Sequence, residues 1–414
     1  MHLKNILPTA LAVAAVYAQE DSDSGSTNLT ALLSGTDTLS SLNDLIGNFP
    51  DLATTLAGLE GVTILAPSND ALESLMSNSS SSSSMLSDEE FVSALLRYHV
   101  INGTVYASNI TESPLFPSTY LNDSTYSNVT GGQVVQAVMN DDDEVEIVSG
   151  LKTRSMVSQA NVNYTNGVVH IIDQVLDIPG NLTSTLVNAN LTALYGAVAN
   201  ASLASTLAGS EDLTIFAPSN AAFQDISSAL ANASMDDLAS ILQYHVVEGT
   251  VAYSSELSNT SLQTLGGENV TITIEDGNVF VNSAQVQNAD IFFAGGVIHV
   301  IDQVLNPNNM TNATSTDDED SEDGDNAFGA TSSGTVVPFT SLVTETATTV
   351  ITDLVTSTSQ VLGTVTPTGG AGSDSADSDS DSDTSTSEDF AALTKPTGVI
   401  GAAALFGGAA MLAF

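Results

Sequence analysis

The sequence predicts an α+β fold that occurs twice along the chain. Three sequence blocks return in the same order: TILAPSNDAL returns as TIFAPSNAAF, YHVINGTV as YHVVEGTV, and GVVHIIDQVL as GVIHVIDQVL. Three matched blocks indicate two copies of one domain. Within each copy the helix-start signals come first and the strand-like segments later, which argues against alternating β-α-β units.

Two Ser-x-x-acid sequences predict the starts of helices, because a serine and an acidic residue at this spacing can cap free backbone N–H groups. Ser87-x-x-Glu90 predicts a helix over residues 91–97, and Ser234-x-x-Asp237 predicts one over residues 238–243. In each copy the sequence Pro-Ser-Asn (residues 67–69 and 218–220) precedes a segment containing Ala and Leu. A Ser or Asn there most simply caps a further helix.

The strand signals follow. The Tyr-His-Val segments predict extended chain that turns at Gly103 and Gly249. Residues 271–275 and 279–282 alternate around Asp276-Gly277, which is a strong β-hairpin signal. The Val/Ile-rich blocks at residues 168–176 and 297–305 predict buried strands that close each copy.

The spacing of the blocks places extra residues in the first copy. The offsets are 151 residues at Thr63/Thr214, 146 at His99/His245 and 129 at His170/His299. Five extra residues therefore lie between the first two blocks, near the serine-rich residues 78–84. Seventeen more lie between the second and third blocks, within residues 112–132. Insertions of this kind are expected in surface loops.

Both ends of the chain carry targeting signals. Residues 1–18 predict a secretory signal peptide, with Lys4 before an apolar stretch and a small-residue cleavage site. Residues 386–414 predict a glycosylphosphatidylinositol (GPI) addition signal, because a spacer and an apolar tail follow small residues. Ser385 is the expected attachment residue, with Asp383 close behind it. A retained transmembrane anchor is the alternative.

The expected domain boundaries follow from these signals. The first domain covers residues 28–178 and the second residues 181–306. Residues 307–385 are rich in Ser, Thr and Asp, so they predict a disordered, O-glycosylated acidic stalk.

Composition excludes several classes of protein. The formal net charge is −44, which excludes nucleic acid as a partner because phosphate binding needs a basic surface. Cysteine is absent, which removes thiol catalysis and thiolate metal sites.

Fifteen Asn-x-Ser/Thr sequons predict a heavily N-glycosylated surface. They are Asn28, Asn78, Asn102, Asn109, Asn122, Asn128, Asn163, Asn181, Asn190, Asn200, Asn232, Asn259, Asn269, Asn309 and Asn312.

The repeated blocks resemble the fasciclin domain of fasciclin I, periostin and fasciclin-like arabinogalactan proteins. The APSN segment, the Tyr-His pair and the closing G-V-[IV]-H-x-I-D-x-V-L block stand in the family's order and spacing. The resemblance covers about residues 28–305. It implies a wedge of two β-sheets with flanking helices and a role in adhesion at cell surfaces or in extracellular matrix. In the first copy Leu72 stands where the second has Phe223.

The histidines after the signal peptide are His99, His170, His245 and His299, two in each copy. A buried, hydrogen-bonded role is the favoured interpretation, because His170 and Asp173 face opposite sides of a strand and zinc would need distant carboxylates. We therefore expect no catalytic residue, no metal site and no cofactor. In animal relatives the Tyr-His segment is implicated in receptor binding. This makes Tyr98, His99, Tyr244 and His245 candidate partner-binding residues, although the sequence does not show that they are exposed.

The sequence thus predicts a non-catalytic, GPI-anchored cell-surface glycoprotein that mediates adhesion or organises cell wall or matrix. Its expected partners are surface or matrix proteins, wall polysaccharides and a second copy of the chain, with the membrane reached through the lipid anchor. The alternative is a vacuolar or other endomembrane protein that acts from the lumen in membrane fusion or trafficking.

Overall fold

The structure is a computed structural model that describes residues 27–78, 86–231, 233–309, 328, 334 and 336–342. The predicted signal peptide, most of the predicted stalk and the predicted GPI signal lie outside these residues. Among the described residues, no helix is both long and apolar enough to cross a membrane.

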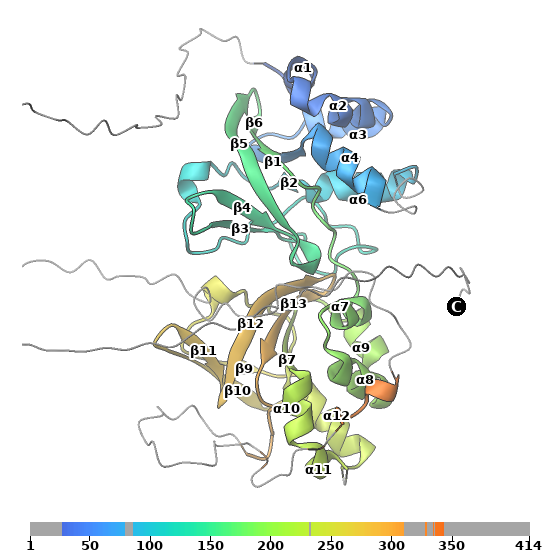
Figure 1. Cartoon of the computed structure of the whole chain (residues 1–414), viewed down its shortest axis with the longest axis vertical. Coiled ribbons are helices and arrows are strands. Elements are labelled where there is room, and N and C mark those ends of the chain that lie inside the picture. The colour runs from blue at the N-terminus through green and yellow to red at the C-terminus, as the bar shows by residue number, and fades with distance from the viewer. Residues whose placement is uncertain are drawn as a thin grey trace, which may run out of the picture. The chain divides into compact units, whose positions relative to one another are not determined.

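Each domain places a group of helices beside a mostly antiparallel sheet (Figure 1). The first domain contains α1 (Leu29–Gly35), η1 (Asp37–Leu39), α2 (Ser40–Gly47), α3 (Pro50–Ala57), β1 (Val62–Pro67), α4 (Asn69–Asn78), α6 (Glu89–Tyr98), β2 (Val100–Ile101), η2 (Ala107–Asn109), β3 (Gln136–Met139), β4 (Val145–Val148), η3 (Gly150–Lys152), β5 (Arg154–Tyr164) and β6 (Gly167–Ile172). The second contains α7 (Leu182–Asn188), α8 (Thr192–Asn200), α9 (Ala204–Gly209), β7 (Leu213–Pro218), α10 (Asn220–Asp225), α11 (Ser227–Leu230), α12 (Met235–Tyr244), β8 (Val246–Val247), η4 (Ser254–Glu256), β9 (Thr260–Gln263), β10 (Asn269–Glu275), β11 (Asn278–Val281), β12 (Ala284–Phe293) and β13 (Gly296–Ile301).

The two sheets share the order of six strands, and the second sheet has one more strand, β9, at its edge. The order is β2-β1-β6-β5-β4-β3 in the first and β8-β7-β13-β12-β11-β10-β9 in the second. The closing strands β6 and β13 lie inside their sheets and pair in parallel with β1 and β7. A Cβ built on Gly167 or Gly296 would collide with the backbone of the facing strand, which explains why each closing strand begins with glycine. The prediction that the closing blocks form buried strands is confirmed.

Each sheet bends so that its two halves pack against each other. In the first domain, Leu65 of β1 and Ile172 of β6 share an apolar cluster with Ala137 of β3 and Ile147 of β4. The bend occurs along β5, whose pairing with β6 is interrupted by two irregularities between Val157 and Val162, as bulges commonly cause. The two halves form the two layers of the expected wedge.

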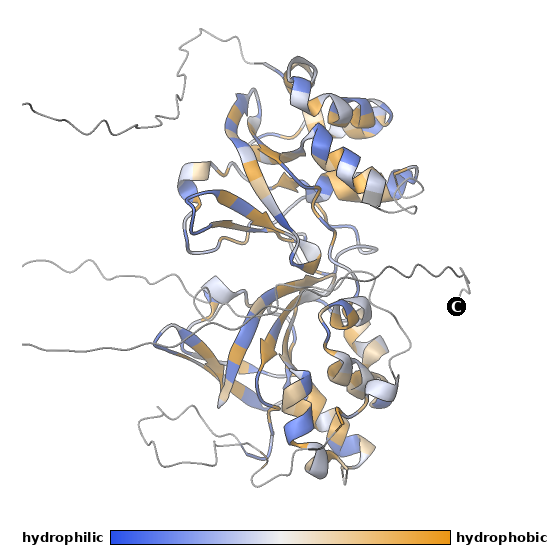
Figure 2. Ribbon diagram, viewed as in Figure 1, coloured by the Kyte–Doolittle hydropathy of each residue, from blue (hydrophilic) through white to orange (hydrophobic). Residues whose placement is uncertain are grey.

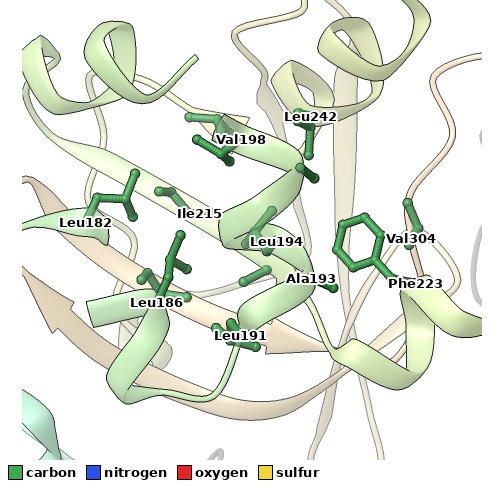
Figure 3. Close-up of a cluster of buried hydrophobic side chains, with 14 of the residues drawn as sticks. Leu182, Leu186, Leu191, Ala193, Leu194, Val198, Ile215, Phe223, Leu242 and Val304 are labelled. Carbon is green, nitrogen blue, oxygen red and sulfur yellow. The ribbon is translucent and has the colours of Figure 1, made fainter. Parts of the chain in front are cut away.

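A second apolar layer joins the helices to the sheet. Figure 2 shows hydrophobic residues along the strands and on the helix faces that turn toward them. In the second domain this core includes Leu186, Leu194, Phe223 and Leu242, each from a different helix, and Ile215 from β7 (Figure 3). The helices are therefore held by side-chain packing against the sheet.

Several local predictions are confirmed. Ser234 caps α12 and forms a reciprocal capping box with Asp237. Asp276 and Gly277 both have positive φ angles, 51° and 81°, and join β10 to β11 in a tight hairpin. Gly103 and Gly249 have φ angles of 112° and 77° at the expected turns.

Two local predictions are wrong. Asp88, not Ser87, caps α6, because the Asp88 carboxylate accepts from the N–H groups of Glu90 and Phe91. The Tyr-His-Val segments are not extended throughout: Tyr98 and Tyr244 are the last residues of α6 and α12. Both tyrosines lie on the buried face of their helix, and burying a large aromatic side chain favours continuing the helix.

Candidate functional site

The tyrosine of each Tyr-His pair is fully buried and ties its helix to the sheet. The Tyr98 hydroxyl donates to the backbone oxygen of Val134 at 3.0 Å. The Tyr244 hydroxyl donates to the backbone oxygen of Asn269 at 3.0 Å and accepts from the Asn282 amide at 2.9 Å. Burial raises the pKa of both phenols. Both tyrosines therefore stay neutral and serve as hydrogen-bonding anchors.

The histidine of each pair joins the end of a helix to the chain that follows the closing strand. His99 Nδ1 lies 2.7 Å from the backbone oxygen of Leu95, and the Leu176 N–H donates to His99 Nε2 at 3.0 Å. In the second domain the same bonds link His245 to the Ile241 oxygen at 2.7 Å and the Leu305 N–H at 2.8 Å. Because one partner accepts and the other donates, each ring is neutral with its proton on Nδ1.

Burial lowers the pKa of His99 and His245 to about 4. At neutral pH these rings carry no charge, and both nitrogens are already bonded within the domain. Their side chains are at most 2% exposed, so they offer almost no surface to a partner. The sequence did not show whether the Tyr-His pairs are exposed. In the structure neither pair lies at the surface.

The other two histidines have a similar structural role. His170 Nε2 lies 2.9 Å from the Val105 oxygen, and His299 Nε2 lies 2.8 Å from the Ala252 oxygen. Burial lowers the pKa of both rings. His170 is buried within β6, whereas Asp173 is exposed and follows the end of this strand at Ile172. Within the described ranges, no group of three His, Asp or Glu side chains could hold a metal ion.

The Pro-Ser-Asn segments also form matching internal bonds. Ser68 and Ser219 accept from the N–H groups of Ala71 and Ala222, which confirms the predicted caps. The asparagines have a second role that the sequence analysis missed. Asn69 Oδ1 accepts from the Ser41 N–H, and Asn220 Oδ1 accepts from the Ala193 N–H, both at 2.9 Å. The repeated asparagine thus hydrogen-bonds to the first turn of an earlier helix in each domain, α2 in the first and α8 in the second.

A polar junction joins the insertion of the first domain to the second domain. The Asn128 N–H donates to the Ala294 oxygen at 2.6 Å. Thr130 donates twice to the Asp212 carboxylate, from its N–H at 2.7 Å and its hydroxyl at 2.6 Å. Just after the insertion, the buried Gln133 amide donates to the Phe293 oxygen at 3.0 Å. Hydrogen bonds to a charged carboxylate are among the stronger ones in proteins.

An aromatic cluster extends this junction. The ring of Phe116, from the insertion, stacks on Tyr253 with centroids 4.7 Å apart and planes 11° apart. Phe292 stands edge-on to both rings, and Val134 and Val297 complete the cluster. Tyr253 and Phe292 are buried.

The expectation of a surface loop is therefore wrong for this part of the insertion. Residues 112–132 contain Phe116, Asn128 and Thr130, and all three contact the second domain. A count of extra residues reveals a loop but not what it covers. The available signal is the number of apolar and aromatic side chains in residues 112–132, Phe116 among them, because large exposed aromatic side chains are uncommon in polar loops.

The described sequons differ in exposure. Asn28, Asn102, Asn109, Asn122, Asn163, Asn181, Asn190, Asn259, Asn269 and Asn309 are exposed, whereas Asn128 and Asn200 are half-buried. The side chains of Asn78, Asn232 and Asn312 lie outside the description. Asn128 Nδ2, the atom to which a glycan attaches, points to the Ala208 oxygen of the second domain at 3.3 Å. The junction therefore disfavours a glycan at Asn128.

The fasciclin domain family model matches residues 37–179 and 189–307. A fasciclin-like arabinogalactan protein of Arthroderma benhamiae is 37% identical over 279 residues, covering 66% of this chain and 65% of the relative. Human periostin is 27% identical over 61% of this chain and 29% of its own length. This chain thus spans less than two thirds of the length of either relative.

A solved fasciclin domain pair from the insect cell adhesion molecule fasciclin I is 22% identical to this chain. The match covers 65% of this chain and 97% of the other, with a TM-score of 0.31. The family match covers more than half of the chain, in two segments that each contain the three repeated blocks. The chain therefore belongs to the fasciclin domain family and carries two copies of the domain in tandem.

Proposed function

We propose that the chain is a GPI-anchored cell-surface glycoprotein whose domain surfaces mediate adhesion or organise the cell wall. One observation carries this proposal: the residues that repeat between the domains bond internally. The Tyr-His pairs and the Pro-Ser-Asn segments each form hydrogen bonds with other residues of their own domain. This leaves binding to the outer surfaces, where the two copies differ.

The relatives support a non-catalytic role. The fungal matches include fasciclin-like arabinogalactan proteins, and the animal matches include periostin and the transforming growth factor-beta-induced protein ig-h3. The neutral, doubly bonded His99 and His245 agree with this role, because a general base needs a free nitrogen and a pKa near the working pH.

Charge favours some partners over others. In the part of the chain that the structure describes, the cationic side chains are Arg97, Lys152 and Arg154, and Arg154 pairs with Glu146 at 2.9 Å. Two copies of a chain with a net charge of −44 repel each other at low salt. We therefore propose neutral wall polysaccharide or a basic surface protein as the principal partner. Contact between two copies should need salt, which shortens the screening length to about 10 Å at 0.1 M.

Beads coated with the secreted chain, residues 19–385, test the adhesive role. We expect them to bind isolated wall polysaccharide at both low and high salt and to cluster with one another only at high salt. Enzymatically deglycosylated chain separates domain surfaces from glycans, and heat-unfolded chain is the matched control. Binding by native deglycosylated chain but not by unfolded chain supports the domain surfaces. Absence of binding to polysaccharide, cells and other beads would remove the proposal.

Membrane display is tested separately on intact cells. Phosphatidylinositol-specific phospholipase C should release the chain into the medium if Ser385 carries a GPI anchor. Retention in an internal membrane fraction, with residues 398–414 still attached, would favour the vacuolar alternative. The anchor signal and Ser385 lie outside the described residues, so this experiment tests a prediction from sequence.

A further inference from the structure

Part of the range that the sequence assigns to the stalk lies against the second domain. We name Gly334 together with residues 336–342 the docked segment; it includes the short helix η5 (Thr340–Leu342). η5 lies beside α8 of the second domain (Figure 1). The segment is about 30 residues beyond β13, so no sheet or hairpin explains its position.

Polar and apolar contacts hold the docked segment. The Gly334 N–H donates to the Gln224 backbone oxygen at 3.1 Å, and the Gln224 side-chain amide donates to the Gly334 oxygen at 2.7 Å. The ring of Phe339 stands edge-on to Phe223, with centroids 6.3 Å apart and planes 85° apart. Val337 and Phe339 are half-buried and pack against the helical core of the second domain.

Gly196 provides the space for this contact. A Cβ at Gly196 would overlap the backbone oxygen of Phe339 and lie 2.8 Å from the Phe339 Cβ. Gly196 is buried within α8, where glycine is less favourable than alanine. Phe339 has a φ angle of 63°, a left-handed conformation that is unfavourable for a non-glycine residue. Both unfavourable features have one common explanation, which is close approach of the segment to α8.

The first domain lacks this receptor surface. The matching bonds of Asn69 to Ser41 and of Asn220 to Ala193 align α2 with α8. This alignment places Asp44 opposite Gly196, and the repeated block places Leu72 opposite Phe223. The first domain therefore has the carboxylate of Asp44 where the second has no side chain. It has an aliphatic side chain where the second has the ring that contacts Phe339.

We propose that the face formed by Gly196 of α8, Phe223 and Gln224 of α10 and Ser227 of α11 is a docking site for the docked segment of the same chain. Gly334 also approaches closely, because a Cβ there would lie 3.1 Å from the Ser227 Cβ. Only 24 residues separate Asn309 from Gly334. A tether of this length gives an effective concentration on the order of millimolar, which favours the chain's own segment over that of another copy.

The docked segment shortens the part of the predicted stalk that follows it. The predicted stalk, residues 307–385, has 79 residues, whereas 43 residues remain from residue 343 through residue 385.

The substitution Gly196→Ala tests the contact between the docked segment and α8 in a chain of residues 19–385, the predicted secreted form. It raises helix propensity but removes the space for Phe339, so the domain should stay folded while the segment is released. We expect chymotrypsin to cleave after Phe339 at least about tenfold faster than in the unaltered chain. Hydrogen exchange at Gly334 should accelerate by a similar factor. Gly47→Ala, which adds the same methyl group to α2 with no atom within 4 Å, is the matched control and should change neither rate.

A labelled peptide of residues 333–343 tests the docking site independently. It should bind secreted chain carrying Phe339→Ala, whose site is vacant, and not the unaltered chain, whose site is occupied. Equal cleavage and exchange rates in the unaltered and Gly196→Ala chains would overturn the proposal. A dimer of the unaltered chain that Phe339→Ala dissociates would overturn the same-chain arrangement and show exchange between copies.

Discussion

The two fasciclin domains share their internal bonds and differ in what their surfaces contact. The His99 ring and the His245 ring make the same two bonds, and both pKa values fall to about 4. The first domain alone carries the insertion that reaches the second domain, and the second alone carries the bare backbone at Gly196. The residues that repeat between the domains therefore maintain the fold. The residues that differ make the contacts that only one of the two domains has.

The largest expected loss of stability comes from removing the histidine side chains whose hydrogen bonds the two domains share. His99→Ala and His245→Ala should each lower the free energy of unfolding of their own domain by about 3–4 kcal/mol. Each leaves a buried backbone N–H without an acceptor and creates a cavity. Chemical denaturation followed domain by domain measures both losses. Glu248→Ala, at an exposed position beside the second pair, is the control. Losses that differ by more than about 2 kcal/mol would show that the two histidines are not equivalent.

Acid should weaken both domains together. A histidine has a pKa near 6.5 in the unfolded chain and about 4 in either folded domain. Between these values the unfolded chain binds more protons, so the free energy of unfolding falls as pH decreases from about 6.5 to 4. The loss approaches about 3 kcal/mol for each of His99 and His245.

Two buried carboxyls oppose this loss. Burial raises the pKa of Asp177 and Asp302, so protonation of these groups favours the folded state as pH falls. Thermal unfolding between pH 7 and 4 measures the net effect. A midpoint that rises throughout this range would contradict the assignment of neutral histidines.

The junction should contribute less than the internal bonds. Phe116→Ala removes the ring that stacks on Tyr253 and should weaken the coupling between the domains by about 2 kcal/mol. Calorimetry should then show two separate unfolding transitions, each near the stability of its own domain. Tyr106→Ala, at an exposed aromatic residue of the first domain, should leave the coupling intact. Identical traces for Phe116→Ala and the unaltered chain would mean that the aromatic cluster couples nothing.

The smallest expected effect concerns a single sequon. Asn128 should carry less glycan than Asn122, because its amide points into the junction whereas Asn122 is exposed. Glycopeptide mass spectrometry measures both occupancies in the secreted chain. Asn128→Gln should lower stability by about 1 kcal/mol or less, the value of one partly exposed hydrogen bond. Full occupancy at Asn128 would contradict the junction as described.

The sequence predicts the parts of the fold that depend on local chemistry. The Ser234 capping box, the Asp276-Gly277 hairpin and the two closing strands each follow from a short stretch of residues. The helical ends at Tyr98 and Tyr244 do not, because long-range burial extends each helix by residues that local signals assign to a strand. The aromatic contact of Phe116 and the docking of Phe339 depend on partners more than 100 residues away, which no local pattern specifies.

The parallel pairing of β1 with β6 and of β7 with β13 determines when each sheet can form during synthesis. The first strand of each domain must wait for the last before its sheet can close. In the first domain 99 residues separate Pro67 from Gly167, which at ribosomal speeds corresponds to about 5–20 s. The first sheet can nevertheless close before β7 has been made, because its own closing strand ends at Ile172. Released chains that end just before Gly167 and just after Leu176 should therefore differ sharply in resistance to protease.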